Sequence, residues 1–259
     1  MTEFATHGFL SDEIREFEAE ILANFKNRFD LADEANKAAH EIIYSVNIHK
    51  NLTELLLATL LTRQAASFQS FLILIQKGLM TQAEIILRNI SETMFIVGAV
   101  GKDEAFAEKF VLSEEVSRKK ALVRLRENHK KYKKEIDQET IDLIDELERK
   151  IREQRIETFT TERIAQIAEL SDYYDTLYPL TSLAVHTSAR GLDKALDVDG
   201  EGEVLAIDYG PIRQDFEMQL DAAISMTLYT FHEVASHFGV EVEKIEQLQR
   251  KNQELSGAA

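Results

Sequence analysis

The chain of 259 residues is 44% hydrophobic and carries 46 acidic against 30 basic side chains, a formal net charge of −16 at pH 7. This length and hydrophobic content allow one sizeable core and exclude a wholly disordered chain. The net charge opposes general attraction to nucleic acid or anionic lipid, but it leaves room for a local basic patch. There is no cysteine, which excludes disulfides, zinc–thiolate sites and a thiol nucleophile.

Only 2 prolines and 10 glycines interrupt the sequence, which favours long helices over many short strands. We therefore predict an all-α fold: a multi-helix bundle of about seven to nine helices, forming a single domain over 1–259. The first residues lack the basic start and apolar run of a signal peptide, and no uncharged apolar stretch reaches the length of a membrane helix. We expect a cytoplasmic protein without membrane contact.

Five apolar residues recur at helical spacing after Ser11 and predict an amphipathic helix that runs to about Phe29. A second, half-buried helix is predicted at 31–46. The segment 52–76 is apolar on nearly every face, which is typical of a central helix surrounded by others. Gly78 ends that helix.

The next helix is predicted at 81–100, with Thr81 as its N-cap. It is again mostly apolar. Together with the helix at 52–76 it is expected to form an antiparallel hairpin at the centre of the fold.

The composition becomes highly charged over 103–157, and its sparse apolar stripe predicts a projecting helical hairpin inserted into the bundle. Nine Lys and Arg stand against one acid, Glu127, between 118 and 134, and seven acids stand against no base between 135 and 148. Two interpretations remain open. Either the two helices run antiparallel and neutralise each other, or the basic helix binds phosphate.

Further helices are predicted at 161–170, 172–196 and 212–238. Pro179 either kinks the second of these or marks its true start. Turn residues followed by an alternating pattern at 197–210 predict one short β-hairpin or ordered loop.

The loop also resembles an EF-hand calcium loop, with Asp197, Asp199, Glu201 and Asp208 at positions 1, 3, 5 and 12. Position 12 is usually Glu, and a Gly-Pro pair interrupts the helix that should follow. An acidic turn is the alternative. We predict no other metal site and no cofactor.

An ionic column is the first candidate site. Glu84, Arg88 and Glu92 follow each other four residues apart and share one side of an otherwise apolar helix. A guanidinium at depth needs carboxylates or a bound anion, because an unpaired buried charge is costly. The two acids either satisfy Arg88 and fix the helix, or Arg88 points at a negatively charged substrate group.

A second polar stripe lies on the later helix, where Tyr178, Ser182, His186 and Arg190 are also four residues apart. Histidine is the usual acid or base of enzymes near neutral pH, so His186 is a candidate general acid or base, while Arg190 or Arg88 can stabilise an anion. The alternative is a core histidine satisfied by Ser182 or Tyr178. No spacing indicates a hydrolase triad.

The segments RQAASFQSFLILIQKGLMTQAEIILRNISETMF and YPLTSLAVHTSARGL resemble the bacterial domain of unknown function 5677 family. That resemblance covers about Arg63 to Leu192. It implies a shared Arg-x-x-x-Glu helix, here Arg88 and Glu92, and a Ser-x-x-x-His helix, here Ser182 and His186. It further implies that the two stripes face each other, and it brings no activity with it.

A fainter resemblance is to the HEPN ribonucleases, helical bundles of bacterial toxin and phage-defence systems with an Arg-x(4–6)-His motif. Here His186 precedes Arg190, and Arg88 lies on another helix, so a match would have to be spatial. We hypothesise on this basis a defence- or stress-associated RNA-cleaving protein, with RNA or another phosphate-containing ligand as its partner. The alternative is a non-enzymatic helical binding or scaffold protein in which the same residues form a structural core network. A homodimer is compatible with both.

Overall fold

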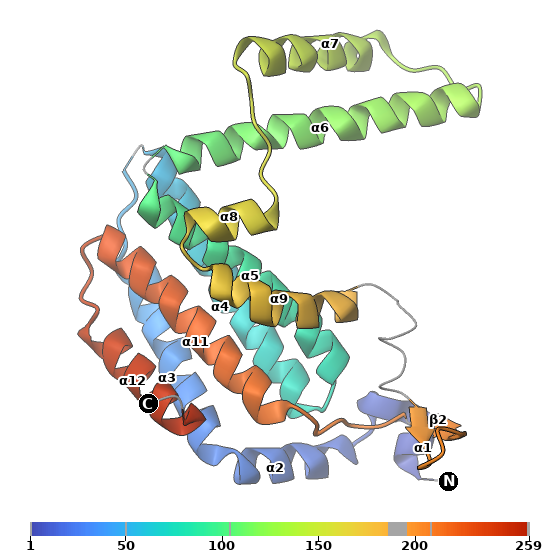
Figure 1. The fold of residues 1–259 in the computed structure, drawn as a ribbon, viewed down its shortest axis with the longest axis vertical. Helices are drawn as coiled ribbons and strands as arrows, with labels where there is room; N and C mark the ends of the chain where they lie inside the picture. Colours follow the sequence, from blue (N-terminus) through green and yellow to red (C-terminus); the bar gives the residue numbers. More distant parts are fainter. Residues whose placement is uncertain (1, 50, 104, 186–195, 208, 258–259) are drawn as a thin grey trace.

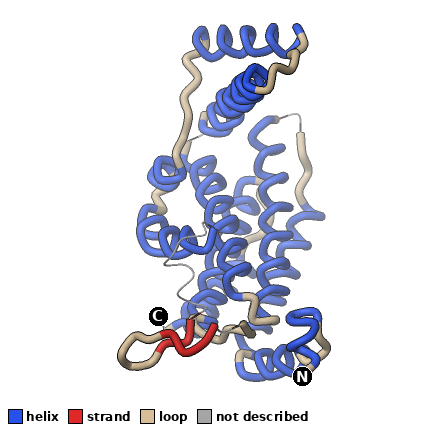
Figure 2. Tube along the Cα trace, turned by 90° about the vertical axis from the view of Figure 1, so that its right-hand side faces the viewer, coloured by secondary structure: helices blue, strands red, loops and turns tan. Residues whose placement is uncertain are grey.

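The computed structural model describes residues 2–49, 51–103, 105–185, 196–207 and 209–257, without the side chains of residues 180, 182, 183 and 185. The fold is all-α apart from one hairpin (Figures 1 and 2). In chain order the elements are α1 (Glu3–His7), the 3₁₀ helix η1 (Gly8–Leu10), α2 (Ile14–Asn24), α3 (Lys26–Ser45), α4 (Leu52–Gln76), α5 (Met80–Lys102), α6 (Phe106–Lys131), α7 (Gln138–Glu153), α8 (Thr161–Ile167), α9 (Ser171–Val185), β1 (Leu196–Val198), β2 (Val204–Ile207), α11 (Phe216–His237) and α12 (Glu243–Ser256). These are eleven α-helices within the described residues, more than the seven to nine predicted.

Helices α4 and α5 form the central hairpin that the sequence predicts, and α11 packs against both (Figure 1). The chain reverses at Gly78, whose φ of +70° places it in the left-handed region. The amide of Leu79 donates to the carbonyl of Leu74 at 3.1 Å and closes the end of α4. Thr81 is not the N-cap of α5, because the helix already begins at Met80 with Leu79 at the cap position.

The predicted helix ending near Phe29 is wrong in its boundary. Helix α2 ends at Asn24 and α3 begins at Lys26, because Phe25 leaves the helical conformation with φ −113° and ψ 27°. Its ring stacks on Phe216 at the start of α11, with centroids 4.5 Å apart. A tertiary contact therefore sets this break.

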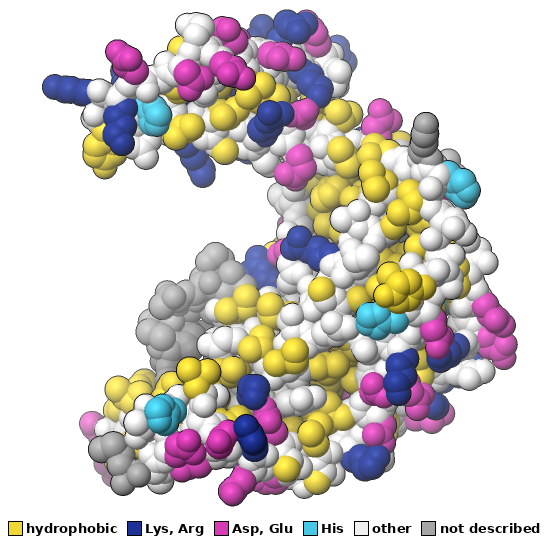
Figure 3. Space-filling view, turned by 180° about the vertical axis from the view of Figure 1, so that it is seen from behind, with side chains coloured by type: hydrophobic (Ala, Val, Ile, Leu, Met, Phe, Trp, Pro, Cys, Tyr) yellow, Lys and Arg dark blue, Asp and Glu magenta, His cyan; other side chains and the backbone are white. Residues whose placement is uncertain are grey.

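Helices α6 and α7 form the projecting arm predicted for the charged segment. Figures 1 and 2 show them standing off the bundle, and Figure 3 shows a hollow between this arm and the body. The arm has a small apolar seam of its own, in which Ile144 and Leu147 of α7 are buried. It is attached where Phe106, at the start of α6, enters the main core beside Phe159.

Strands β1 and β2 pair antiparallel, and this hairpin is the β element predicted at 197–210. The predicted helix to Leu196 is wrong at its end, since Leu196 lies in β1 opposite Ile207. At the base of the hairpin Tyr209 contacts the rings of Phe4 and Phe9, an anchor that joins two parts of the chain distant in sequence. In the described part of the chain, no helix is both long and apolar enough to cross a membrane.

Candidate functional site

Arg88, Glu92 and Tyr178 meet between α5 and α9. The Nε of Arg88 donates to Glu92 Oε1 at 3.1 Å, and its Nη2 donates to the Tyr178 hydroxyl at 2.5 Å. The same hydroxyl lies 3.1 Å from Glu92 Oε1, which closes a triangle of polar atoms. The guanidinium also lies over the Tyr178 ring, 4.4 Å from its centroid, a cation–π geometry. The two predicted stripes therefore face each other at these three residues.

The triangle stands at the edge of the core rather than inside it. Tyr178 is buried, the Arg88 side chain is 17% exposed and the Glu92 side chain is 38% exposed. Among the described residues, nothing donates a hydrogen bond to the second carboxylate oxygen of Glu92, Oε2. An ionised carboxylate oxygen at a partly exposed position can accept a proton or a ligand hydroxyl.

Helix α8 and the start of α9 complete the surroundings of Tyr178. The Thr161 hydroxyl lies 3.3 Å from the Tyr178 hydroxyl; the single phenolic proton can serve Thr161 or Glu92, but not both. The ring of Tyr174 stacks on that of Tyr178, with centroids 4.9 Å apart. Burial, and then the Glu162 carboxylate, raise the pKa of Tyr174, so this ring stays neutral at physiological pH.

Glu84, the first member of the ionic column, contacts a different helix. Its side chain is buried at 6% exposure, and Gln219 of α11 donates to its Oε1 at 2.8 Å. Gln219 is itself 4% exposed. Glu84 thus joins α5 to α11, whereas Arg88 and Glu92 join α5 to α9. The described contacts of the column therefore reach two different helices.

The rest of the second stripe is only partly described. The backbone of Ser182 belongs to α9, one turn after Tyr178, and nothing is described of its side chain. His186 and Arg190 lie outside the described residues. Pro179 neither starts nor ends α9, which begins eight residues earlier at Ser171 and continues to Val185.

The acidic loop adopts a hairpin turn. Asp199 Oδ1 accepts the backbone amides of Glu201 and Glu203, each at 2.9 Å, while Asp197 pairs with Ala206 as part of β1. Asp208, position 12 of the calcium pattern, lies outside the described residues. In the part of the chain that the structure describes, no group of three or more His, Asp or Glu could hold a metal ion.

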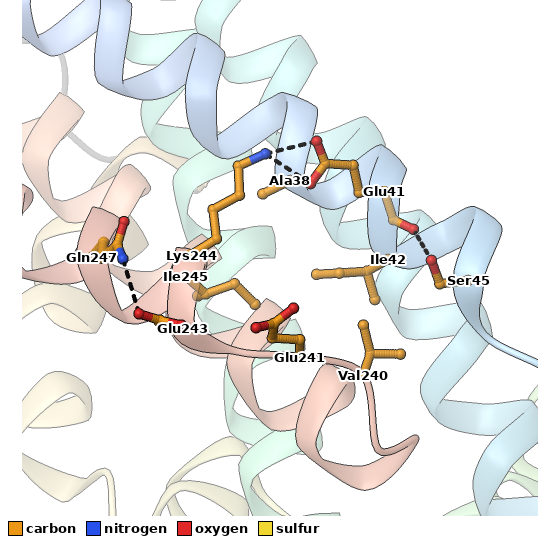
Figure 4. A pocket seen from close by; sticks show the side chains of 10 residues that line it. All are labelled: Ala38, Glu41, Ile42, Ser45, Val240, Glu241, Glu243, Lys244, Ile245 and Gln247. Carbon is orange, nitrogen blue, oxygen red and sulfur yellow. Dashed lines mark hydrogen bonds and ion pairs between the residues drawn. The ribbon is translucent and has the colours of Figure 1, made fainter.

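A surface cavity of about 370 Å³ lies elsewhere, between α3 and α12 (Figure 4). Its apolar floor includes Ile42 and Ile245, and its rim carries the ion pair of Glu41 with Lys244, 2.7 Å apart. None of the predicted site residues lines this cavity.

Sequence reasoning missed Tyr174, Thr161 and Gln219. Tyr174 extends the four-residue spacing of the second stripe by one turn towards the N-terminus, so the spacing alone could have identified it. Gln219 is a polar residue three positions after the buried Phe216, which indicates a core-facing amide. Nothing in the sequence marks Thr161, because its contact depends on how α8 crosses α5 and α9.

Comparison with known proteins identifies the family to which the chain belongs. No curated protein and no solved structure matches the chain. The profile of the family of unknown function DUF5677 matches residues 54–204. The matched segment contains α5, α9 and the triangle of Arg88, Glu92 and Tyr178. Because the match covers more than half of the sequence, the chain belongs to the family of unknown function DUF5677.

Proposed function

We propose that the protein is a metal-independent, HEPN-like ribonuclease that acts in the bacterial cytoplasm in defence or stress, with its site on the α5–α9 face. The observation that carries the proposal is the triangle of Arg88, Glu92 and Tyr178. It holds a cation beside a carboxylate whose Oε2 accepts no hydrogen bond from the described residues. Phosphodiester cleavage without a metal needs such a pair: a fixed positive charge for the phosphate and a proton acceptor.

In the proposed reaction the ribose 2′-hydroxyl attacks the adjacent phosphorus while Glu92 Oε2 takes its proton. The bond from phosphorus to the 5′-oxygen breaks, and His186 donates the proton that this oxygen needs to leave. The products are a 2′,3′-cyclic phosphate and a 5′-hydroxyl. Arg88 stabilises the charge that develops on the phosphoryl oxygens, and Tyr178 positions Arg88. The assignment of His186 comes from its place in the sequence, eight residues after Tyr178.

A second candidate is a non-enzymatic helical binding or scaffold protein in which the same residues form a structural core network. It is favoured by Glu84, which is buried and bonded to Gln219, and by the direct pairing of Arg88 with Glu92. In that case the triangle only joins α5 to α9. The two candidates predict different effects of Glu92→Gln on RNA cleavage.

The decisive experiment uses labelled single-stranded RNA, with and without EDTA, and analyses the ends of any products. Glu92→Gln keeps the side-chain volume and an oxygen for Arg88 but removes the proton acceptor. His186→Ala removes the proposed acid. The ribonuclease predicts cleavage that resists EDTA, yields cyclic phosphate ends and falls at least about a hundredfold in either variant, with little change in the thermal midpoint. No cleavage by the wild type, or equal cleavage by all three proteins, would refute it in favour of the binding protein.

We also propose a homodimer, joined by the outer edges of the two β2 strands. Apolar side chains of the hairpin are exposed, including Val204, Leu205 and Ile207, and an isolated two-stranded hairpin is marginally stable in water. β2 carries no charged residue within Val204–Ile207, whereas β1 contains Asp197 and would oppose a like charge in a symmetric pair. Antiparallel pairing of β2 with its copy also separates the two acidic tips.

A further inference from the structure

The projecting arm carries the strongest charge segregation in the chain. Seven of the nine basic residues at 118–134 are exposed, in a protein of net charge −16. They are Arg118, Lys120, Arg124, Lys130, Lys131, Lys133 and Lys134. The acids at 135–148 are on α7 and the loop before it, and they provide the obvious neutralising partner. The ion pairs between α6 and α7 show how far these acids neutralise the basic residues.

One ion pair joins the two segments among the described residues: Lys119 with Glu148, at 3.0 Å. The pKa of Glu148 is lowered by its hydrogen bond with Lys119 first, and by Arg126 and Arg152 more weakly. Arg118 instead pairs with Glu115 of its own helix, at 3.9 Å. Within the described residues, the acids at 135–148 therefore neutralise the basic segment at one pair. The other ion pair across the arm, Lys150 of α7 with Glu115 of α6 at 2.6 Å, involves neither segment, and seven of the nine basic residues have no described acid within 4 Å.

Three of these residues share one face of α6. Lys120, Arg124 and Lys131 lie roughly 100° to 140° around the helix from Lys119, which marks the side facing α7. We name Lys120, Arg124 and Lys131 the basic stripe. It extends about 16 Å along the helix. Among the described residues, no acid of α7 forms an ion pair with the basic stripe, and salt at physiological strength screens charges over about 8 Å.

An aromatic residue stands at the end of the stripe. Tyr132 is 62% exposed, and the Lys131 ammonium lies 5.5 Å from its ring centroid. The residues on both sides of it, Lys131 and Lys133, are exposed bases. Exposed aromatic rings among basic residues are typical of surfaces that bind single-stranded nucleic acid, because bases stack on the ring while the cations follow the backbone.

We infer that the arm binds single-stranded RNA, with the backbone along the basic stripe and a base stacked on Tyr132. The binding is independent of sequence, because lysine and arginine here contact phosphates and the ring accepts any base. The choice of RNA over DNA rests on the proposed function. The arm holds the strand, and no cleavage chemistry is assigned to it.

The test measures binding of a labelled single-stranded RNA by fluorescence anisotropy between about 50 and 200 mM salt, with His186→Ala as the common background so that the probe stays intact. The stripe variant combines Lys120→Gln, Arg124→Gln and Lys131→Gln. The control combines Arg149→Gln, Arg152→Gln and Arg155→Gln, three exposed residues at the end of α7 and just after it, with the same loss of charge. Circular dichroism checks that both variants keep their helices.

The stripe variant should bind at least about tenfold more weakly, and its log–log salt slope should fall by about 2, since each phosphate contact on a single strand contributes about 0.7. The control should stay within about threefold of the parent. Tyr132→Ala should lose about tenfold in affinity without a change in slope. Binding weaker than millimolar by the parent protein, or equal losses in the stripe variant and the control, would overturn the inference.

The outcome is separate from that of the proposed function. Binding by the arm without any cleavage would refute the ribonuclease and leave the arm as an RNA-binding surface. For cleavage, the stripe substitutions are made in the protein that keeps His186. Cleavage equal to that of the wild type at every RNA concentration would then support the ribonuclease and refute the arm. A single-stranded DNA probe of the same length binding as tightly as RNA would show that the arm binds either single strand, and would overturn the choice of RNA.

Discussion

The hydroxyl of Tyr178 takes part in both contacts of the polar triangle that join α5 to α9, so Tyr178→Phe is its most informative change. The substitution keeps the ring over Arg88 and against Tyr174. It removes the acceptor for Arg88 Nη2 and the contact with Glu92 Oε1. Hydrogen bonds to charged groups contribute about 1.5–3 kcal/mol each. Water can replace part of this, because Arg88 and Glu92 are partly exposed, and we expect a net loss of about 1–2 kcal/mol in the free energy of unfolding.

For a chain of this size such a loss lowers the thermal midpoint by about 2–4 °C, which circular dichroism at a helix-sensitive wavelength can measure. Tyr44→Phe is the matched control, since Tyr44 is 86% exposed and its midpoint should stay within about 1 °C of the wild type. The triangle as described predicts a difference between the two variants. Equal midpoints for Tyr178→Phe and Tyr44→Phe would refute the claim that the hydroxyl joins α5 to α9.

Three further predictions concern the frame around the site. At Gly78 an added Cβ would lie 2.6 Å from the Pro211 Cβ, whereas at Gly239, also at positive φ, it would meet nothing within 4 Å. In urea unfolding, Gly78→Ala should therefore lower the free energy of unfolding clearly more than Gly239→Ala, for which the positive φ alone predicts a loss of roughly 1–2 kcal/mol. Equal losses would contradict the close approach at Gly78. Burial, and then the Glu233 carboxylate, raise the pKa of Tyr229 to about 12, above an unfolded value of about 10. The folded state keeps this proton longer, so stability should fall as the pH rises from about 10 to about 12, and a fall just as steep in Tyr229→Phe would exclude Tyr229 as its source. Ile207→Lys should convert the proposed dimer to a monomer in light scattering, whereas Val198→Lys on the other strand should not; a dimer that persists in Ile207→Lys would argue against pairing through β2.

The sequence predicts most of the bundle because its long helices carry periodic apolar patterns that need no tertiary information. Residues 52–76 are helical at the predicted positions, and the charged arm and the short hairpin are present where their composition changes. The errors lie where a contact between distant segments overrides the local pattern. Phe25 continues an apolar period, yet its stacking on Phe216 breaks the helix there.

The polar site was predictable to the extent that helical spacing determines it. Residues four apart share a face, so Arg88 with Glu92 on one helix, and Tyr178 with its stripe on another, could be found without coordinates. Spacing cannot determine which partner each member takes. Glu84 lies on the same side of α5 as Arg88, yet it bonds Gln219 on α11, because α5 is packed between two helices and the column passes from one to the other. Within the described contacts the charged residues of this central helix therefore reach two different helices, and the contact with α9 combines a cation, a phenol and a partly exposed carboxylate.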